Sequence, residues 1–156
     1  MRRKRNIKRE YTPDIVHGSI AVGRFINYLM KGGKKSTAER ILYDAFDEIG
    51  AHTKEEPIVI FDRALQNASP ALEVRTKRVG GANYQVPREV RPERKFFLTC
   101  KWIIEAASGK KGKPMHQKLA AELIAASQGE GDAIKKKQAM HRMAEANRAF
   151  AHFLGR

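Results

Sequence analysis

The stretch LEVRTKRVGGANYQVPREV, residues 72–90, decides the fold. It contains two segments of alternating residues, 72–76 and 84–90, on either side of Gly80-Gly81-Ala82-Asn83. Glycine and asparagine tolerate the positive φ that a tight hairpin turn requires, so the stretch predicts a β-hairpin. No other segment alternates convincingly with period two, and a hairpin alone is marginally stable in water. We therefore expect it to project as an arm that other elements hold.

The predicted arm is strongly basic. The basic side chains along it and at its base are Arg75, Lys77, Arg78, Arg88, Arg91, Arg94 and Lys95. They are opposed in the same region only by Glu73, Glu89 and Glu93. Such an arm suits a polyanion.

Length and charge restrict the class of protein. The chain has 156 residues and 31 basic against 17 acidic residues, giving a net charge of +14. This length favours one domain, and this charge on a small chain indicates a nucleic acid or an anionic membrane surface as partner. Membrane is the weaker interpretation, because the longest apolar runs have about four residues and a spanning helix needs about 20. We read no targeting segment, and the single cysteine, Cys100, excludes an internal disulfide.

Apolar residues at helical spacing predict a mainly α fold. The expected helices begin at Ile20, near Ser36, at Pro57, at Pro92, near Met115 and at Asp132. They end at Gly32-Gly33, near Ile49, at Ser69, at Ser108-Gly109, near Gln128-Gly129 and at about Phe150. The prediction is thus a bundle-like domain of six helices, residues 11–156, with a two-stranded arm at 72–90. Residues 1–10 are predicted to be a basic, disordered N-terminal tail, because they contain too few apolar side chains to order themselves.

Two helix starts have recognisable caps in the sequence. Ser36 and Glu39 have the spacing of a capping box, and Asp132 is a good N-cap for the last helix. In that last helix the residues expected to face inward are Ala133, Ala139 or Met140, Met143, Asn147 and Phe150. Those expected to face outward are Lys135, Lys136, Lys137 and Arg142.

The charge is distributed unevenly. Residues 36–62 contain seven acids and two bases, a net charge of −5, which leaves +19 for the rest of the chain. A solvated helix face is the simpler interpretation of the acidic segment. The alternative is that Asp44 and Glu48 form a contact for another basic protein.

Basic clusters outside the arm lie in the tail, in loops and at a helix start. They comprise residues 2–9, Lys31 with Lys34-Lys35, residues 110–118 and residues 135–137. Together the clusters favour phosphate binding. Arginine planes and exposed aromatic rings such as Tyr84 can stack on splayed bases, which is how folded or single-stranded RNA is often recognised. Tyr84 is equally suited to cross-strand packing.

The sequence shows no recognisable catalytic or metal site. Gly32-Gly33-Lys34-Lys35-Ser36 resembles a phosphate-binding loop, but Tyr28 stands where the first glycine is required and Lys35 where Ser or Thr is required. The five histidines show no metal-ligand spacing with one another or with Cys100. We therefore expect no enzymatic activity, no cofactor, no metal and no small-molecule substrate.

Three segments resemble a known family. Residues 70–75 (PALEVR) with 78–90 (RVGGANYQVPREV), residues 29–35 (LMKGGKK) and residues 141–153 (HRMAEANRAFAHF) closely resemble the small-subunit ribosomal protein seven family in its bacterial form. The resemblance covers essentially the whole chain. It implies a six-helix domain with a protruding β-hairpin.

The resemblance also implies a function. Such a protein binds the 3′ major domain of small-subunit 16S rRNA early, nucleates folding of the subunit head and lies near the tRNA exit site. It would be a structural constituent of a bacterial, rather than organellar, ribosome in the cytoplasm, with neighbouring ribosomal proteins as further partners. Its mechanism would be binding and not turnover.

The expected contacts follow from the basic clusters and the resemblance. The residues expected to contact rRNA are Arg2, Arg3, Lys4, Arg5, Lys8, Arg9, Lys31, Lys34, Lys35, Arg75, Lys77, Arg78, Arg88, Arg91, Arg94, Lys110, Lys111, Lys113, Lys118, Lys136 and Arg142. The residues expected near exit-site tRNA or mRNA are Arg78, Gly80, Gly81, Ala82, Asn83 and Tyr84.

Two other classes of protein remain as alternatives. An architectural DNA-binding protein also carries hairpin arms on a helical body, but such arms usually end in an apolar wedge. Here the tip is Gly80-Gly81-Ala82-Asn83, which contains nothing bulky. An RNA-modifying enzyme would need a cofactor loop or a catalytic constellation, which the sequence does not show.

Overall fold

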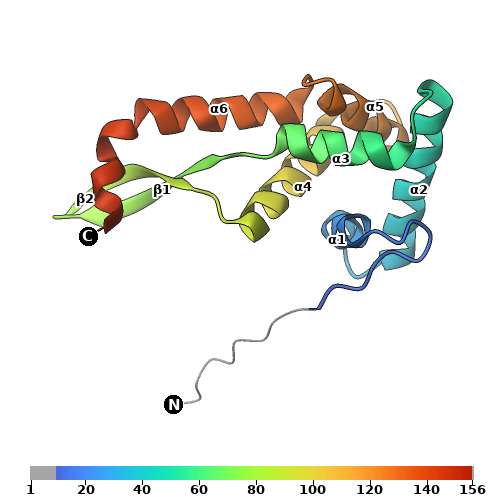
Figure 1. Cartoon of the computed structure of the whole chain (residues 1–156), viewed down its shortest axis with the longest axis horizontal. Helices are drawn as coiled ribbons and strands as arrows, with labels where there is room; N and C mark the ends of the chain where they lie inside the picture. The colour runs from blue at the N-terminus through green and yellow to red at the C-terminus, as the bar shows by residue number, and fades with distance from the viewer. Residues whose placement is uncertain (1–9, 156) are drawn as a thin grey trace, which may run out of the picture.

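The computed structural model describes residues 10–155 and is mainly helical (Figure 1). The elements in chain order are α1 (Ile20–Leu29), α2 (Lys35–His52), α3 (Pro57–Ala68), β1 (Leu72–Val79), β2 (Ala82–Glu89), α4 (Pro92–Gly109), α5 (Met115–Ser127), α6 (Asp132–Ala146) and the 3₁₀ helix η1 (Arg148–Gly155). This order confirms the predicted mainly α fold with one two-stranded hairpin. The basic tail lies almost wholly outside the described residues, and the division at residue 10 stays a prediction.

Helices α1 to α5 form the body of the molecule. Helix α5 packs against α2, α3 and α4, and α1 rests on α2 and α4. The centre contains Phe61, whose ring meets Phe25 and Phe46 edge to face at centroid distances of 5.3 and 5.6 Å. All three rings are at most 2% exposed. The apolar stripes therefore face one another as their helical spacing predicts.

The hairpin turns through only two residues. Val79 pairs with Ala82, and the intervening Gly80 and Gly81 have φ of 58° and 89°. This left-handed backbone is strained for residues with a side chain, so the two glycines permit the turn. The strands extend further than the alternation predicts, because the turn is tighter than the four residues 80–83.

Helix α6 links the body to the arm. It starts beside α5 and runs along the hairpin, and η1 then folds back against β2 (Figure 1). The predicted continuation of the last helix to Phe150 is wrong, because α6 ends at Ala146. At this point the Asn147 side chain donates to the Met143 carbonyl oxygen at 2.8 Å, a local bond that competes with helix continuation. The turn brings Phe150 against the ring of Tyr84.

The burial pattern of α6 also differs from the expectation at two residues, Met143 and Lys137. Met143, expected to face inward, is 46% exposed, and its neighbour Ala144 is the buried residue. The second half of α6 packs against the hairpin through Ala144, which leaves the neighbouring Met143 in solvent. Ala133 is buried as expected, while Met140 is partly buried against the core. Lys137, expected to face outward, is half-buried and donates to the Asn67 carbonyl oxygen at 2.6 Å.

Both predicted N-caps are wrong. Helix α2 begins one residue before Ser36, and its N-cap Lys34 makes no side-chain capping bond. Helix α6 begins at Asp132 with Gly131 as N-cap, at φ 95°. The acceptor for the Ala133 amide comes instead from Glu122 of α5, whose Oε1 lies 2.9 Å away. Tertiary structure thus replaces the local cap that the sequence offers.

The segment before α1 is fastened to α2. The Tyr43 hydroxyl donates to Asp14 Oδ1 at 2.7 Å, and the amides of Val16 and His17 donate to Oδ2. Burial alone would raise the pKa of Asp14, but these hydrogen bonds outweigh it and hold the pKa below its usual value. Burial and the Asp14 carboxylate raise the pKa of Tyr43 to about 12. Both groups therefore keep this contact at neutral pH.

Candidate nucleic-acid interface

The turn between α1 and α2 presents two lysines together. Gly32 and Gly33 have φ of 58° and 76°, and a Cβ at either position would meet no other atom, so the backbone conformation explains these glycines. The Lys34 amide donates to the Lys31 carbonyl oxygen at 3.2 Å, which closes the turn. Lys31 and Lys34 are exposed and have no carboxylate partner within residues 10–155. Lys35 is different, because its Nζ lies 3.6 Å from Glu39 Oε1.

The loop between α4 and α5 separates two kinds of lysine. Lys111 and Lys113 are exposed, and the described part of the chain offers them no acidic partner. Lys110 instead lies with its Nζ 2.6 Å from Oε2 of Glu122, whose side chain is fully buried. This pairing gives Lys110 a structural role, and its predicted contact to rRNA stays a prediction. Lys118, at the start of α5, is half-buried and makes no ion pair with any described residue.

The base of the arm is organised by Glu73. Its side chain is 4% exposed and lies 2.8 to 3.3 Å from the guanidinium nitrogens of Arg75, Arg88 and Arg94. Burial alone would raise the pKa of Glu73, but the hydrogen bonds from Arg88 and Arg94 and the charge of Arg75 outweigh it and lower the pKa. These arginines are 31 to 51% exposed, so each still reaches solvent. One carboxylate thus binds three of the predicted rRNA contacts and fixes their direction.

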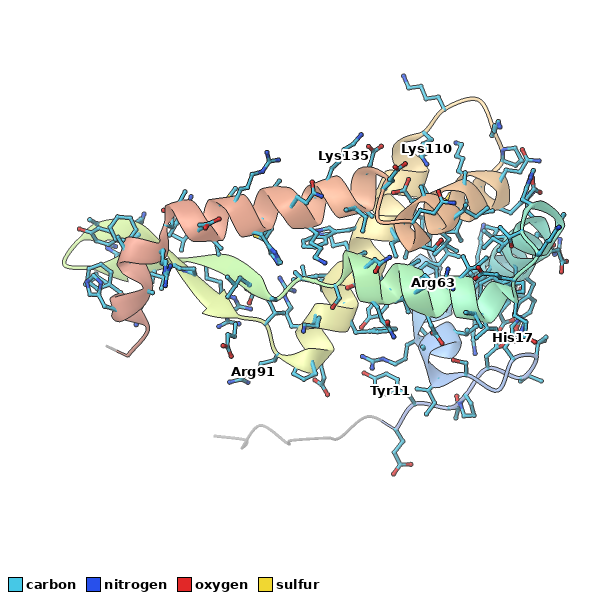
Figure 2. All side chains as sticks on the ribbon, turned by 45° about the horizontal axis from the view of Figure 1, so that its top comes forward. Tyr11, His17, Arg63, Arg91, Lys110 and Lys135 are labelled. Carbon is cyan, nitrogen blue, oxygen red and sulfur yellow. The ribbon has the colours of Figure 1, made fainter. Side chains whose placement is uncertain are left out.

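The other basic residues predicted to contact rRNA also fall into two groups, those without a partner and those that bind a neighbouring side chain or carbonyl oxygen. Arg78, Arg91 and Arg142 are exposed and have no acidic partner among the residues that the structure describes. Lys136 is paired with Glu105 at 2.8 Å. Lys77 donates to the Phe153 carbonyl oxygen at 2.8 Å and so ties the arm to the C-terminal segment. Figure 2 shows Arg91 at the base of the arm and Lys110 at the start of the loop between α4 and α5, so these two residues lie at opposite ends of α4.

The tip of the arm consists of small, exposed residues, and the tyrosine that follows them is partly covered. Gly80, Gly81, Ala82 and Asn83 are exposed. Tyr84 is half-buried, with its ring centroid 5.3 Å from that of Phe150 and 5.0 Å from that of Phe153. Of the two interpretations of Tyr84, the structure therefore supports packing, although the partner is the C-terminal segment and not the opposite strand.

Part of the predicted interface falls outside the described residues. These are the tail residues Arg2, Arg3, Lys4, Arg5, Lys8 and Arg9. Their contacts to rRNA stay a prediction. Near the start of the described chain, the Arg24 guanidinium lies 4.4 Å from the ring centroid of Tyr11 and 4.3 Å from that of Phe96, so Arg24 fastens Tyr11 to α1.

Sequence reasoning missed the two carboxylates that arrange the basic residues. Glu122 could have been found, because with Leu119, Leu123 and Ala126 it lies on the apolar stripe of α5, where a charge needs a partner. Glu73 was harder to single out, because one acidic residue among several arginines in a strand is usually explained as compensation of charge. Only the folded hairpin brings Arg88 and Arg94 to it.

The described residues contain neither a cluster of metal ligands nor a membrane-spanning helix. Within 10–155, no group of three or more histidine, cysteine, aspartate or glutamate side chains could hold a metal ion. No helix in this range is long and apolar enough to cross a membrane. Burial raises the pKa of the Cys100 thiol to about 12, against a smaller opposite effect of Arg24, so this cysteine is a poor nucleophile at neutral pH.

Comparison with known proteins agrees with this architecture. Residues 1–148 match the family described as "Ribosomal protein S7p/S5e". The protein named "Small ribosomal subunit protein uS7" of Thermotoga maritima is 54% identical over 153 residues, which are 98% of this chain and 99% of the relative. Proteins of the same name from Phytoplasma mali and Polynucleobacter necessarius are 51% and 52% identical over 154 and 152 residues. These alignments cover 97 to 99% of each chain.

A basic helical body with one projecting hairpin is thus the architecture of a ribosomal protein. The chain belongs to the ribosomal protein S7p/S5e family. Membership confirms the resemblance seen in the sequence and makes the chain a structural constituent of the small ribosomal subunit, acting in translation in the cytoplasm. The family implies a structural role.

Proposed function

We propose that this protein is a primary binder of small-subunit 16S rRNA, that it recognises the 3′ major domain and that it nucleates assembly of the subunit head. In this proposal the arm extends toward exit-site tRNA and mRNA. The observation that supports it best is the set of cations without carboxylate partners among the described residues, which are spread over the body, the arm and α6. Their residues are Lys31, Lys34, Arg78, Arg91, Lys111, Lys113, Lys118 and Arg142.

Unpaired cations at separate positions suit a folded RNA. A single basic stripe would match one groove of a DNA duplex, whereas clusters on the body and the arm can contact different RNA helices. If about eight phosphates are neutralised, affinity falls on the order of 10³- to 10⁵-fold between about 50 and 200 mM salt. The bulky apolar wedge of an architectural DNA-binding arm is missing, because the turn consists of Gly80 and Gly81 and Tyr84 packs on Phe150.

The proposal is tested by the affinity of the purified protein for a transcript of the 3′ major domain at low and moderate salt. An unrelated RNA and a DNA duplex of equal length serve as controls. We expect tight binding to the domain transcript alone, persisting at moderate salt. Equal binding to all three, lost as salt rises, would replace specific rRNA recognition with general polyanion binding.

Paired and unpaired arginines of the arm should differ in this assay. Arg78→Ala removes a free cation, so we expect lower affinity and a salt slope smaller by about one. Arg75→Ala removes a cation that Glu73 already partly neutralises, so its effect should be smaller. The double variant should bind least without loss of the helical signal. Arg63→Ala is the matched control, because Arg63 is paired with Glu55 at 2.7 Å in the acidic part of the body.

A neighbouring basic protein is a further proposed partner. Asp44 and Asp47 are exposed on α2, and within residues 10–155 neither has a basic partner. Glu48 lies 3.6 Å from His52 Nε2. Charge reversal at Asp44 and Glu48 should weaken incorporation beside protein neighbours while leaving binding to the isolated transcript unchanged.

A further inference from the structure

A cavity of about 400 Å³ opens where the turn between α1 and α2 meets α4 and α5. Its apolar lining comes from four elements. The residues are Leu29, Ile41, Ile104 and Met115. Leu29 is 7% exposed, and the other three are half-buried side chains packed against the core. The floor therefore belongs to the rigid body and does not depend on the arm.

The rim of the same cavity is cationic. Lys31, Lys34 and Lys118 border it, and its lining contains no carboxylate. As described above, none of the three lysines has an acidic partner in the described chain. The glycine turn brings the first two to the same side, because the Lys34 amide closes onto the Lys31 carbonyl oxygen. Thr37 and Ser108 add exposed hydroxyl groups.

Two helices begin at this cavity without side-chain caps. Helix α2 starts at Lys35 and α5 at Met115, and neither has an acidic residue in its first turn. Free amides at a helix start and the positive end of the helix dipole favour a phosphate. The cavity thus combines an apolar floor with an anion-binding rim.

We propose that this cavity takes one splayed nucleotide of the rRNA, with its base on the apolar floor and its flanking phosphates on the lysine rim. The inference rests on the proposed rRNA binding and assigns it a base-binding subsite. A partner protein's apolar side chain would use the floor, but it would leave three lysines and two helix starts without an anion. The larger cavity between the arm and α6, about 590 Å³, is less suitable, because Glu89 and Glu145 border it beside Arg88 and Arg148 and offset their positive charge.

The test fills the cavity without removing a charge. Thr37→Trp places an indole at the rim, and Ser36→Trp places the same group on the adjacent exposed position that does not line the cavity. The indole would exclude the base and remove its contribution to the binding free energy. We therefore expect Thr37→Trp to lower affinity for the 3′ major domain transcript about tenfold. The salt slope should stay unchanged, because no phosphate contact is lost. Ser36→Trp should bind within about twofold of the parent chain.

The outcomes separate this subsite from the proposed function. If the unchanged protein fails to prefer the domain transcript, the rRNA proposal fails. If it binds specifically and Thr37→Trp binds equally well, only the base-binding subsite is overturned. Unchanged RNA affinity with weakened incorporation beside protein neighbours would assign the cavity to a protein instead.

A second measurement needs no variant, in case Thr37→Trp does not fold. The unchanged protein is irradiated with a transcript that contains 4-thiouridine, and the cross-linked peptides are identified by mass spectrometry. We expect one nucleotide attached to the peptide that contains Met115. Specific binding with cross-links only outside the cavity lining overturns the proposal.

Discussion

The body and the arm are stabilised by different forces. In the body, apolar stripes meet around Phe61, and burial of such surface depends little on salt or on mild changes of pH. In the arm, Val86 and Pro87 of β2 are also buried, but the base is held by the buried Glu73 carboxylate, and the contact near the tip is one between aromatic rings. Polar contacts to half-exposed side chains are weakened by salt and by changes of pH. We therefore expect the arm to loosen while the body stays folded, so that binding by the two regions is separable.

The largest effect should come from the centre of the body. Phe61→Ala removes a fully buried ring between Phe25 and Phe46, so we expect a loss of about 3–5 kcal/mol in the free energy of unfolding. The helical signal should unfold at a much lower denaturant concentration, and the arm should be lost with it. Val59→Ala is the control, since Val59 lies on the same helix and is 45% exposed. An arm that survived in the unfolded body would contradict the comparison.

A smaller effect is expected where the body itself contains an ion pair. Lys110→Met leaves the buried Glu122 carboxylate without its cation, which should cost about 2–3 kcal/mol after allowance for the partial exposure of Lys110. Lys111→Met is the matched variant, because Lys111 is exposed and unpaired. We expect it to keep the stability and to reduce the salt slope of RNA binding by about one. Equal stabilities of the two variants in a denaturant titration would remove the structural role of Lys110.

The arm should open when its carboxylate is neutralised. Glu73→Gln weakens the contacts to Arg75, Arg88 and Arg94, and we expect a loss of about 1–2 kcal/mol in the local opening free energy of the hairpin. Hydrogen exchange of the strand amides should accelerate, while exchange in α3 and α5 stays unchanged. Uniform acceleration through the body would show that the two regions are not separable.

Acid should produce the same result in the unchanged protein. The Glu73 pKa is below its usual value of about 4.5, so the arm gains stability above that pH and loses it as the pH falls through the lowered pKa. Burial and the charge of Lys137 also lower the pKa of His141, whose Nε2 accepts a hydrogen bond from the Ala71 amide at 3.0 Å. Its protonation, below about pH 6.5, opposes folding of the same region. Hydrogen exchange against pH should show the arm opening before the body.

The smallest effect should come from the aromatic contact near the tip. Tyr84→Ala removes the ring that packs on Phe150 and Phe153, and we expect a local loss of about 1 kcal/mol. The amides of β2 should exchange faster, with no change in the melting temperature of the body. Asn83→Ala, at the exposed neighbouring position, should change neither quantity. Equal effects of both substitutions would mean that η1 does not hold the tip.

Much of the fold could be predicted, because local patterns and tertiary contacts agree. The stripe Val22, Phe25, Ile26 and Leu29 is buried as its spacing predicts, and the two glycines of the hairpin have the positive φ that the turn needs. Predictions failed where a residue far away in the sequence determines the local structure. Asp132 could have capped α6, but Glu122 reaches the Ala133 amide from another helix.

The candidate site was predictable only as a set of charges. Sequence reasoning grouped Lys110 with Lys111 and Arg75 with Arg78, because neighbouring residues of one charge look alike in a sequence. The structure separates each pair according to whether a carboxylate lies near. The cavity bordered by Lys31, Lys34 and Lys118 could not be foreseen, since it exists only after four elements meet.

The 3₁₀ helix η1 is made long after the arm that it packs against. Lys77 and Phe153, which join the arm to η1, are 76 residues apart in sequence. Because a polypeptide is made from its N-terminus, both strands emerge long before the aromatic rings that cover them. The nascent hairpin therefore stays uncovered until η1 has been made. A truncated product that lacks η1 would contain a formed body and an unsupported arm.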